Sequence, residues 1–262
     1  MTKTACLTIK NLSMVYGEVV IQKSLNFTIN RGDIFIIMGG SGCGKSTLLM
    51  HLIGLLRPAI GDVFYGTENL WSVTPEERQQ LLRHTGVLFQ SGALLSSMTL
   101  AENVALPLTE HTKLDAERIR DIVEYKLALV GLAGFGDYYP AELSGGMLKR
   151  AGLSRAMALD PEMLFFDEPS AGLDPITAKL MDDLIRNLRD HLGATIVMVT
   201  HELDSILAIG DNSIFLDSET KTIIASGPPQ QLLAESKDPK VQRFLTRDQT
   251  TGNYNHAHNR DE

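Results

Sequence analysis

The fold of this chain is decided by one glycine-rich stretch, Gly39-Gly40-Ser41-Gly42-Cys43-Gly44-Lys45-Ser46. It matches the pattern G-x-x-x-x-G-K-[ST] and lies between an apolar run at 33–38 and a helix-forming segment at 45–56. Glycines let successive backbone N–H groups wrap phosphate oxygens, and the following helix presents its positive N-terminus to the same anion. A flexible glycine turn, the alternative, would need neither flanking segment. The stretch therefore predicts a nucleotide-binding loop.

Polar side chains also follow the ends of three further apolar runs. Gln90 comes after 85–89, Asp167-Glu168 after 163–166, and His201 after 194–200. In open α/β sheets, ligands bind beyond the carboxyl ends of the strands. We therefore expect an α/β fold with a mostly parallel sheet, in which these side chains and the glycine-rich loop meet at one site.

The side chains in the loop and at these strand ends are of types that bind or hydrolyse a nucleoside triphosphate. Lys45 supplies a positive charge to the outer phosphates, and Ser46 and Asp167 can be Mg²⁺ ligands. Glu168 is placed to orient or deprotonate a water that attacks the γ-phosphate. For His201 and Gln90, taken alone, a structural position is the better interpretation; together with the other strand ends, they are predicted to contact the γ-phosphate or the water.

The remaining segments predict an antiparallel hairpin, several helices and a polar tail. Residues 7–29 alternate in polarity around a turn beside Tyr16, which either packs in the hairpin or stacks on adenine; both interpretations stay open. Helices are expected at 115–130 and 175–192 from their apolar spacing. The predicted domains are an ATPase domain over 1–245, with a helical subdomain at about 91–160, and a disordered tail at 246–262.

The composition of the chain limits which partners it is expected to bind and in which cellular compartment it is expected to work. The chain has 262 residues, a net charge of −8 and no long Lys/Arg run, which argues against a nucleic-acid surface. Its two cysteines, Cys6 and Cys43, have no metal-binding or redox spacing, so a reducing compartment is expected. Its apolar runs are far shorter than the ~20 residues that cross a bilayer, and we expect no signal peptide. Any work at a membrane would need a membrane-spanning partner.

A second glycine loop, Leu143-Ser144-Gly145-Gly146-Met147, has no lysine of its own. The residues after it are typical of a helix, so Ser144, Gly145 and Gly146 lie at a helix N-terminus, which attracts anions. A simple helix start would look the same. Because the first loop already surrounds a nucleotide, the second makes sense if it faces the nucleotide of another subunit. Asp174, followed by Pro175, similarly suits a helix N-cap and could also serve a subunit contact.

Taken in order along the chain, these motifs resemble the ATP-binding cassette (ABC) family over almost all of the predicted ATPase domain. The matching elements are the aromatic residue Tyr16, the Walker A loop through Thr47, the Q-loop residue Gln90, the signature at Ser144–Gly146, the Walker B residues Asp167 and Glu168, the D-loop ending at Asp174, and the switch residue His201. The resemblance implies ATP hydrolysis with Mg²⁺ held by Ser46, Gln90 and Asp167. It also implies a head-to-tail dimer that holds two ATP molecules between Walker A of one chain and the signature of the other.

The segment at 89–108 is similar, more narrowly, to the ATPases that serve MCE-type lipid transporters. That resemblance implies phospholipid transport at the cytoplasmic face of the inner membrane of a Gram-negative bacterium. It also implies an integral permease, an MCE-domain protein and a small STAS-domain protein as partners. Two residues depart from the usual family pattern: Met147 stands where the signature commonly has Gln, and Gly40 where the Walker A loop often has Pro. Neither removes a charged group or a backbone donor, so we expect hydrolysis to survive.

Other functions remain as alternatives. The chain could serve a transporter for another substrate, or be a soluble cassette ATPase that acts on DNA or ribosomes. Proteins of the second kind usually fuse two cassettes or carry an insertion, and this sequence has neither. A kinase or GTPase is disfavoured, because the sequence lacks an Asn-Lys-x-Asp motif and a kinase has no use for the second glycine loop.

Overall fold

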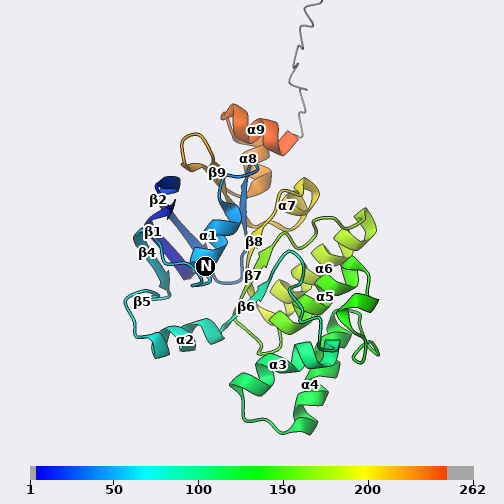
Figure 1. Cartoon of the computed structure of the whole chain (residues 1–262). Coiled ribbons are helices and arrows are strands. Elements are labelled where there is room, and N and C mark those ends of the chain that lie inside the picture. Colours follow the sequence, from blue (N-terminus) through cyan, green and yellow to red (C-terminus); the bar gives the residue numbers. More distant parts are fainter. Residues whose placement is uncertain (1–3, 247–262) are drawn as a thin grey trace, which may run out of the picture.

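The computed structural model describes residues 4–246, and its centre is a six-stranded sheet (Figure 1). The strands lie in the order β10-β9-β3-β8-β7-β6. Five of them run parallel: β9 (Asn212–Asp217), β3 (Ile34–Gly39), β8 (Thr195–Val199), β7 (Met163–Asp167) and β6 (Thr85–Leu88). Only the edge strand β10 (Thr222–Gly227) pairs antiparallel. The expectation of a mostly parallel sheet is confirmed.

The central strands are apolar along their whole length because both faces of this sheet are covered. Every residue of β3 and of β8 is buried. Alternate side chains point to opposite faces, so Phe35 and Ile37 enter one hydrophobic core while Ile34 and Ile36 enter the other. The sheet therefore separates two cores.

The first core lies between the central sheet and a second, antiparallel sheet near the N-terminus. That sheet has the order β2-β1-β4-β5, with β1 at Ala5–Tyr16, β2 at Val19–Asn30, β4 at Ile60–Tyr65 and β5 at Glu68–Asn69. Helix α1 (Lys45–Leu52) contributes Leu48, Leu49 and Leu52 to this core. Phe27 of β2 stacks on Phe35 of β3, with 5.6 Å between ring centroids, which joins the two sheets. The predicted hairpin at 7–29 is thus two strands of a larger sheet.

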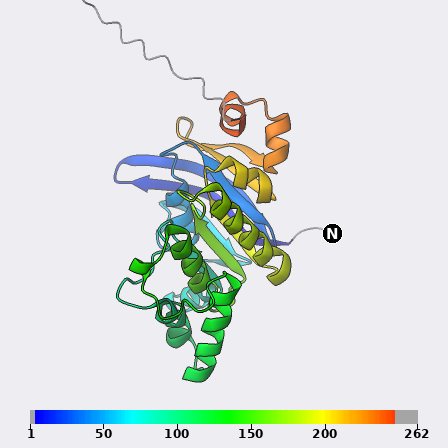
Figure 2. The same ribbon diagram turned by 90° about the vertical axis from the view of Figure 1, so that its right-hand side faces the viewer.

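Helices form the second core with the opposite face of the central sheet (Figure 2). Those nearest the sheet are α5 (Gly145–Ala156), α6 (Pro175–Leu192) and α7 (Leu203–Ile209), while α3 (Leu100–His111) and α4 (Ala116–Leu129) pack on α5. Residues 91–160 hold α3, α4, α5 and the 3₁₀ turn at Pro140–Glu142, and no strand falls within this range. Their status as a separate subdomain stays a prediction.

The remaining helices close the edges of the molecule. They are α2 (Pro75–Arg83), α8 (Pro229–Glu235) and α9 (Pro239–Thr246). Phe244 of α9 makes an edge-to-face contact with Phe215 of β9, with 5.2 Å between ring centroids. The helix predicted at 45–56 ends earlier, at Leu52, because Gly54 adopts a left-handed conformation (φ 74°).

Residue 246 is the last residue of α9, and the remainder of the predicted tail lies outside the described residues. Within residues 4–246, none of the helices has both the length and the apolar character that crossing a membrane requires.

Candidate active site

The parallel pairing of β3, β8, β7 and β6 puts the carboxyl ends of these strands at one edge of the sheet. Gly39 ends β3, Asp167 ends β7, and His201 comes two residues after β8. Backbone pairing continues past the strand ends, since the N–H of Glu168 donates to the carbonyl oxygen of Val199 over 2.9 Å. The sheet thus brings together the loop, the two carboxylates and the histidine.

The glycine-rich loop joins β3 to α1 in a conformation that only glycine tolerates well. Gly42 and Gly44 have φ values of 74° and 94°. A Cβ atom on Gly44 would lie 2.5 Å from Cγ2 of Ile21, so a side chain at this position would force Ile21 to move. The Lys45 ammonium folds back over the loop and donates to the carbonyl oxygens of Gly39 and Gly40, each over 3.0 Å. The loop therefore carries its positive charge at the helix N-terminus, where an anion would bind.

The β1–β2 hairpin holds this loop from the side. The buried amide Nε2 of Gln22 donates to the carbonyl oxygen of Cys43 over 2.8 Å and to that of Asp217 over 3.0 Å. Burial raises the pKa of the Cys43 thiol, which is 1% exposed. Tyr16, at the turn of the same hairpin, is 81% exposed. An aromatic ring that packed inside the hairpin would be buried. The exposure of Tyr16 therefore favours a ring that faces solvent.

Two oxygen ligands suitable for Mg²⁺ meet beside the loop. The Ser46 hydroxyl donates to Oδ1 of Asp167 over 3.0 Å. Burial raises the pKa of the Asp167 carboxyl; the Ser46 hydrogen bond and the Lys45 charge act in the opposite direction, while the Glu168 charge adds to the rise. Mg²⁺ commonly takes one or two protein oxygens and completes its shell with phosphate oxygens and water. This pair fits such a site.

Glu168 and His201 form the second contact of the site. Nδ1 of His201 lies 2.8 Å from Oε1 of Glu168. Glu168 is 8% exposed, and its other carboxylate oxygen, Oε2, is buried without a hydrogen-bond partner. Its backbone is left-handed, with φ 52°, a conformation that costs about 1–3 kcal/mol in a residue that is not glycine. Such strain is common at functional sites, and here it accompanies a carboxylate oxygen that has no hydrogen-bond partner.

The second glycine loop begins a helix, as predicted, but on the other face of the sheet. Ser144 is the N-cap of α5, and its hydroxyl oxygen accepts from the N–H of Met147 over 3.3 Å. Helix α5 packs in the core on the α6 side, whereas α1 packs in the core between the two sheets. The structure therefore separates the two helix N-termini that sequence reasoning assigned to phosphates.

Asp174 and Gln90 occupy the positions expected from the sequence without completing the site within one chain. Asp174 is the exposed N-cap of α6 and accepts from the N–H groups of Ile176 and Thr177, each over 3.1 Å. Gln90 follows β6 and is exposed. Their contacts with nucleotide, like those of Thr47, Gly145 and Gly146, stay predictions.

Sequence reasoning missed Lys149, whose ammonium bonds to the segment that carries Glu168. It is 7% exposed and donates to the carbonyl oxygens of Glu168 (3.0 Å) and Ala171 (2.6 Å). A lysine in a helix next to an arginine normally indicates a solvent-facing surface. Nothing in the spacing around Lys149 distinguishes it from such a residue.

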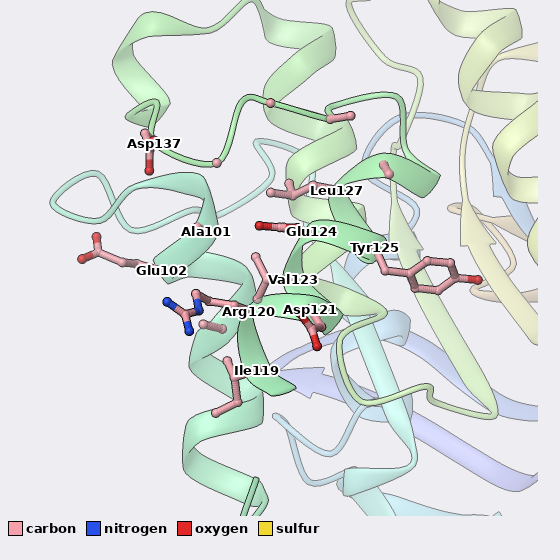
Figure 3. A pocket seen from close by; sticks show the side chains of 15 residues that line it. Ala101, Glu102, Ile119, Arg120, Asp121, Val123, Glu124, Tyr125, Leu127 and Asp137 are labelled. Carbon is pink, nitrogen blue, oxygen red and sulfur yellow. The ribbon is translucent and has the colours of Figure 1, made fainter. Parts of the chain in front are cut away.

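A groove of about 880 Å³ lies apart from this site, between α3, α4 and the loop at 133–137. Val123 and Leu127 give it an apolar floor, and Glu102, Glu124 and Asp137 lie around it (Figure 3). With Asp121 included, four carboxylates line the groove against one basic side chain, that of Arg120. The groove therefore has an apolar base and a negative rim.

Comparisons with known proteins agree with this geometry. Residues 22–171 match the family model described as ABC transporter. The chain is 40% identical over 237 residues to the intermembrane phospholipid transport system ATP-binding protein MlaF of Haemophilus influenzae, covering 90% of this chain and 89% of that protein. It is 41% identical to the probable ribonucleotide transport ATP-binding protein mkl of Mycobacterium bovis, of which it covers 65%.

Among solved structures, the chain is similar to the ATP-binding cassette MJ0796 in a dimeric post-hydrolysis state bound to ADP and phosphate. The TM-score is 0.76 at 29% identity, covering 84% of this chain and 97% of that one. The fold and the strand-end site define a P-loop ATPase. The chain belongs to the ABC transporter family and is an ATP-hydrolysing transporter subunit.

Replacing Lys45 by Ala should weaken ATP binding at least about tenfold, or about 1.4 kcal/mol, because the loop loses its only ammonium. Titration of the purified chain with a fluorescent ATP analogue measures this. Lys113→Ala, which removes an exposed lysine between α3 and α4, is the matched control and should bind as wild type. Unchanged affinity in Lys45→Ala would contradict the assignment of the loop.

Proposed function

We propose that this chain powers phospholipid transport between the inner and outer membranes of a Gram-negative bacterium, as the ATPase subunit of an MCE-type transporter. The observation that carries the ATPase chemistry is the buried, unpartnered Oε2 of Glu168 beside the Ser46–Asp167 pair. The cargo is supported by the relatives: the chain covers 89% of the MlaF protein but 65% of the mkl protein. It is also supported by the resemblance of residues 89–108 to the lipid-transport branch.

In the proposed reaction, Glu168 accepts the proton of a water whose oxygen attacks the γ-phosphorus of ATP, and the bond from that phosphorus to the β,γ-bridging oxygen breaks, releasing ADP and phosphate. A carboxylate in hydrogen-bond reach of the water is suited to this transfer. His201 fixes one oxygen of Glu168 and leaves the other for the water. Lys45 exchanges its loop carbonyl partners for phosphate oxygens, and Tyr16 offers its exposed ring to adenine. Bound at Ser46 and Asp167, Mg²⁺ would supply charge neutralisation to the phosphates.

The complete site requires a second copy of the chain. Ser144 starts a helix on the face opposite α1, so its N-terminus is available to the nucleotide of another chain rather than its own. The dimeric MJ0796 cassette supports pairing of this kind. We infer a head-to-tail dimer with two ATP molecules, each between the loop at 39–46 of one chain and Ser144, Gly145 and Gly146 of the other. Gln90 and Asp174 would complete each site, with Gln90 near the metal.

An integral permease would be the membrane partner, joined by an MCE-domain protein and a STAS-domain protein. This places the chain peripherally at the cytoplasmic face of the inner membrane. The groove between α3 and α4 supports a docking position for the permease, because its apolar floor suits an amphipathic segment. Its negative rim favours basic residues at the ends of that segment.

Glu168→Gln should bind ATP as wild type but hydrolyse it at least about 100-fold more slowly, since the amide cannot take the proton of the water. Phosphate release and ATP affinity of the purified complex measure both effects, and size-exclusion chromatography with ATP should show a long-lived dimer. Glu202→Gln is the control, because its carboxylate lies 3.6 Å from His201 outside the strand end. Wild-type turnover in Glu168→Gln would remove Glu168 from its proposed role.

Chains with Ser144→Arg and chains with Lys45→Ala should each be inactive alone and regain activity when mixed. In a mixed dimer, the intact loop at 39–46 of the Ser144→Arg chain faces the intact signature of the Lys45→Ala chain. With random pairing, about a quarter of wild-type turnover should return, since about half of the dimers are mixed and each has one complete site. A mixture as inactive as its components would exclude shared sites.

Reversing the rim charges with Asp121→Lys and Glu124→Lys should detach the chain from its membrane subunit. Affinity purification of a tagged permease measures the retained ATPase subunit. Glu110→Lys, an exposed charge reversal near the end of α3 and outside the groove, is the matched control. Full retention of the double variant would show that docking occurs elsewhere.

The cargo is tested with the purified transporter in vesicles. We expect ATP to drive transfer of a fluorescent phospholipid between donor and acceptor vesicles, and we expect the complex with Glu168→Gln to transfer no more than vesicles without ATP. Uptake of radiolabelled ribonucleotides with no lipid transfer would instead indicate that ribonucleotides are the cargo, as the name of the mkl protein states for that protein.

A further inference from the structure

Lys149 is a buried cation whose charge is met by main-chain oxygens rather than by a hydrogen-bonded carboxylate. Its Nζ donates to the carbonyl oxygens of Glu168 and Ala171 over 3.0 Å and 2.6 Å. Burial lowers the pKa of Lys149, while the charges of Glu168 and Glu202 oppose this. A buried amine is retained at such a position only where its hydrogen bonds are made.

The two carbonyl groups bracket the turn that follows the catalytic strand. The N–H of Ala171 donates to the carbonyl oxygen of Glu168 over 3.3 Å, closing the turn that Lys149 also bridges. Within this turn, Glu168 has the left-handed backbone that leaves Oε2 free. Lys149 thus fixes the backbone on which the direction of the Glu168 side chain depends.

Lys149 also belongs to the helix that starts at the second glycine loop. Ser144 is the N-cap of α5, and Lys149 lies five residues further on, about 7.5 Å along the helix axis. A helix moves as a unit over so short a distance. Helix α5 therefore connects the anion site at its N-terminus to the backbone of Glu168 in the same chain.

We propose that Lys149 is a positioning residue that holds Glu168 against its own chain's nucleotide and links this hold to the signature helix α5. The inference rests on the proposed function, in which Ser144 serves the ATP of the partner copy. Binding of the partner copy's ATP at Ser144 would then change the position of Glu168 through α5 and Lys149. The two ATP sites of the dimer are connected within each chain by this contact.

Lys149→Met keeps the length of the side chain and removes the donors. We expect kcat to fall about tenfold or more with KM for ATP within about twofold, because a misplacement of about 1 Å can cost about 100-fold while the loop at 39–46 is untouched. Lys149→Gln, whose amide can donate to a carbonyl group, should recover part of kcat. The measurements are steady-state ATP hydrolysis and thermal unfolding of the full chain in its complex.

Arg150→Met is the matched control on the same helix. Arg150 also donates to two backbone carbonyl groups, those of Val130 (3.0 Å) and Gly131 (3.4 Å), at the end of α4. Both variants should lower the melting temperature, and only Lys149→Met should lower kcat beyond that. Equal kcat in the two variants would overturn the inference, whereas wild-type behaviour of Lys45→Ala and Glu168→Gln would contradict the proposed ATPase reaction itself.

Mixed dimers separate an effect on Glu168 from an effect on Ser144. The reference pairs wild type with Lys45→Ala, which leaves one working loop. Placing Lys149→Met on the chain with the working loop should lower turnover, because that chain supplies Glu168. Placing it on the Lys45→Ala chain, which supplies Ser144, should retain the reference activity. The reverse pattern would overturn the inference.

Discussion

The parallel pairing of β3, β8 and β7 is the constraint on which the whole site depends. It aligns three carboxyl ends at one edge of the sheet, where Lys45, Asp167 and His201 meet although they are far apart in the sequence. The pairing continues for one residue beyond β7, from the N–H of Glu168 to Val199. That last hydrogen bond helps to hold Glu168 in a left-handed backbone conformation, which is unfavourable for a residue other than glycine. The hydrogen bonds of the sheet thus offset the backbone strain at Glu168.

The sequence predicts this part of the molecule well because each element has a local cause. Fully apolar runs of five or six residues indicate strands covered on both faces, and the motif at 39–46 needs a strand before it and a helix after it. Ser144 and Asp174 precede helices as N-caps, and the structure has both. The helix predicted to reach Leu56 ends at Leu52, because Gly54 ends it first.

The contacts that adjust the site are less accessible to sequence reasoning. Gln22 and Lys149 are polar residues in segments whose neighbours suit a surface, and each becomes buried only when distant elements pack around it. Gln22 joins β2 to the glycine-rich loop, and Lys149 joins α5 to Glu168. No local pattern encodes such a contact, because its partner lies on another element. The groove between α3 and α4 is similar, since its acidic rim is assembled from two helices and a loop.

The burial of Cys43 has a chemical consequence for the glycine-rich loop. The thiolate is the form of cysteine that reacts with oxidants and alkylating agents. Because burial raises the pKa of this thiol, and its side chain is almost inaccessible, Cys43 stays protonated and shielded at neutral pH. The loop therefore contains a sulfur atom that behaves as a small apolar group, and its packing shields this thiol from oxidants and alkylating agents.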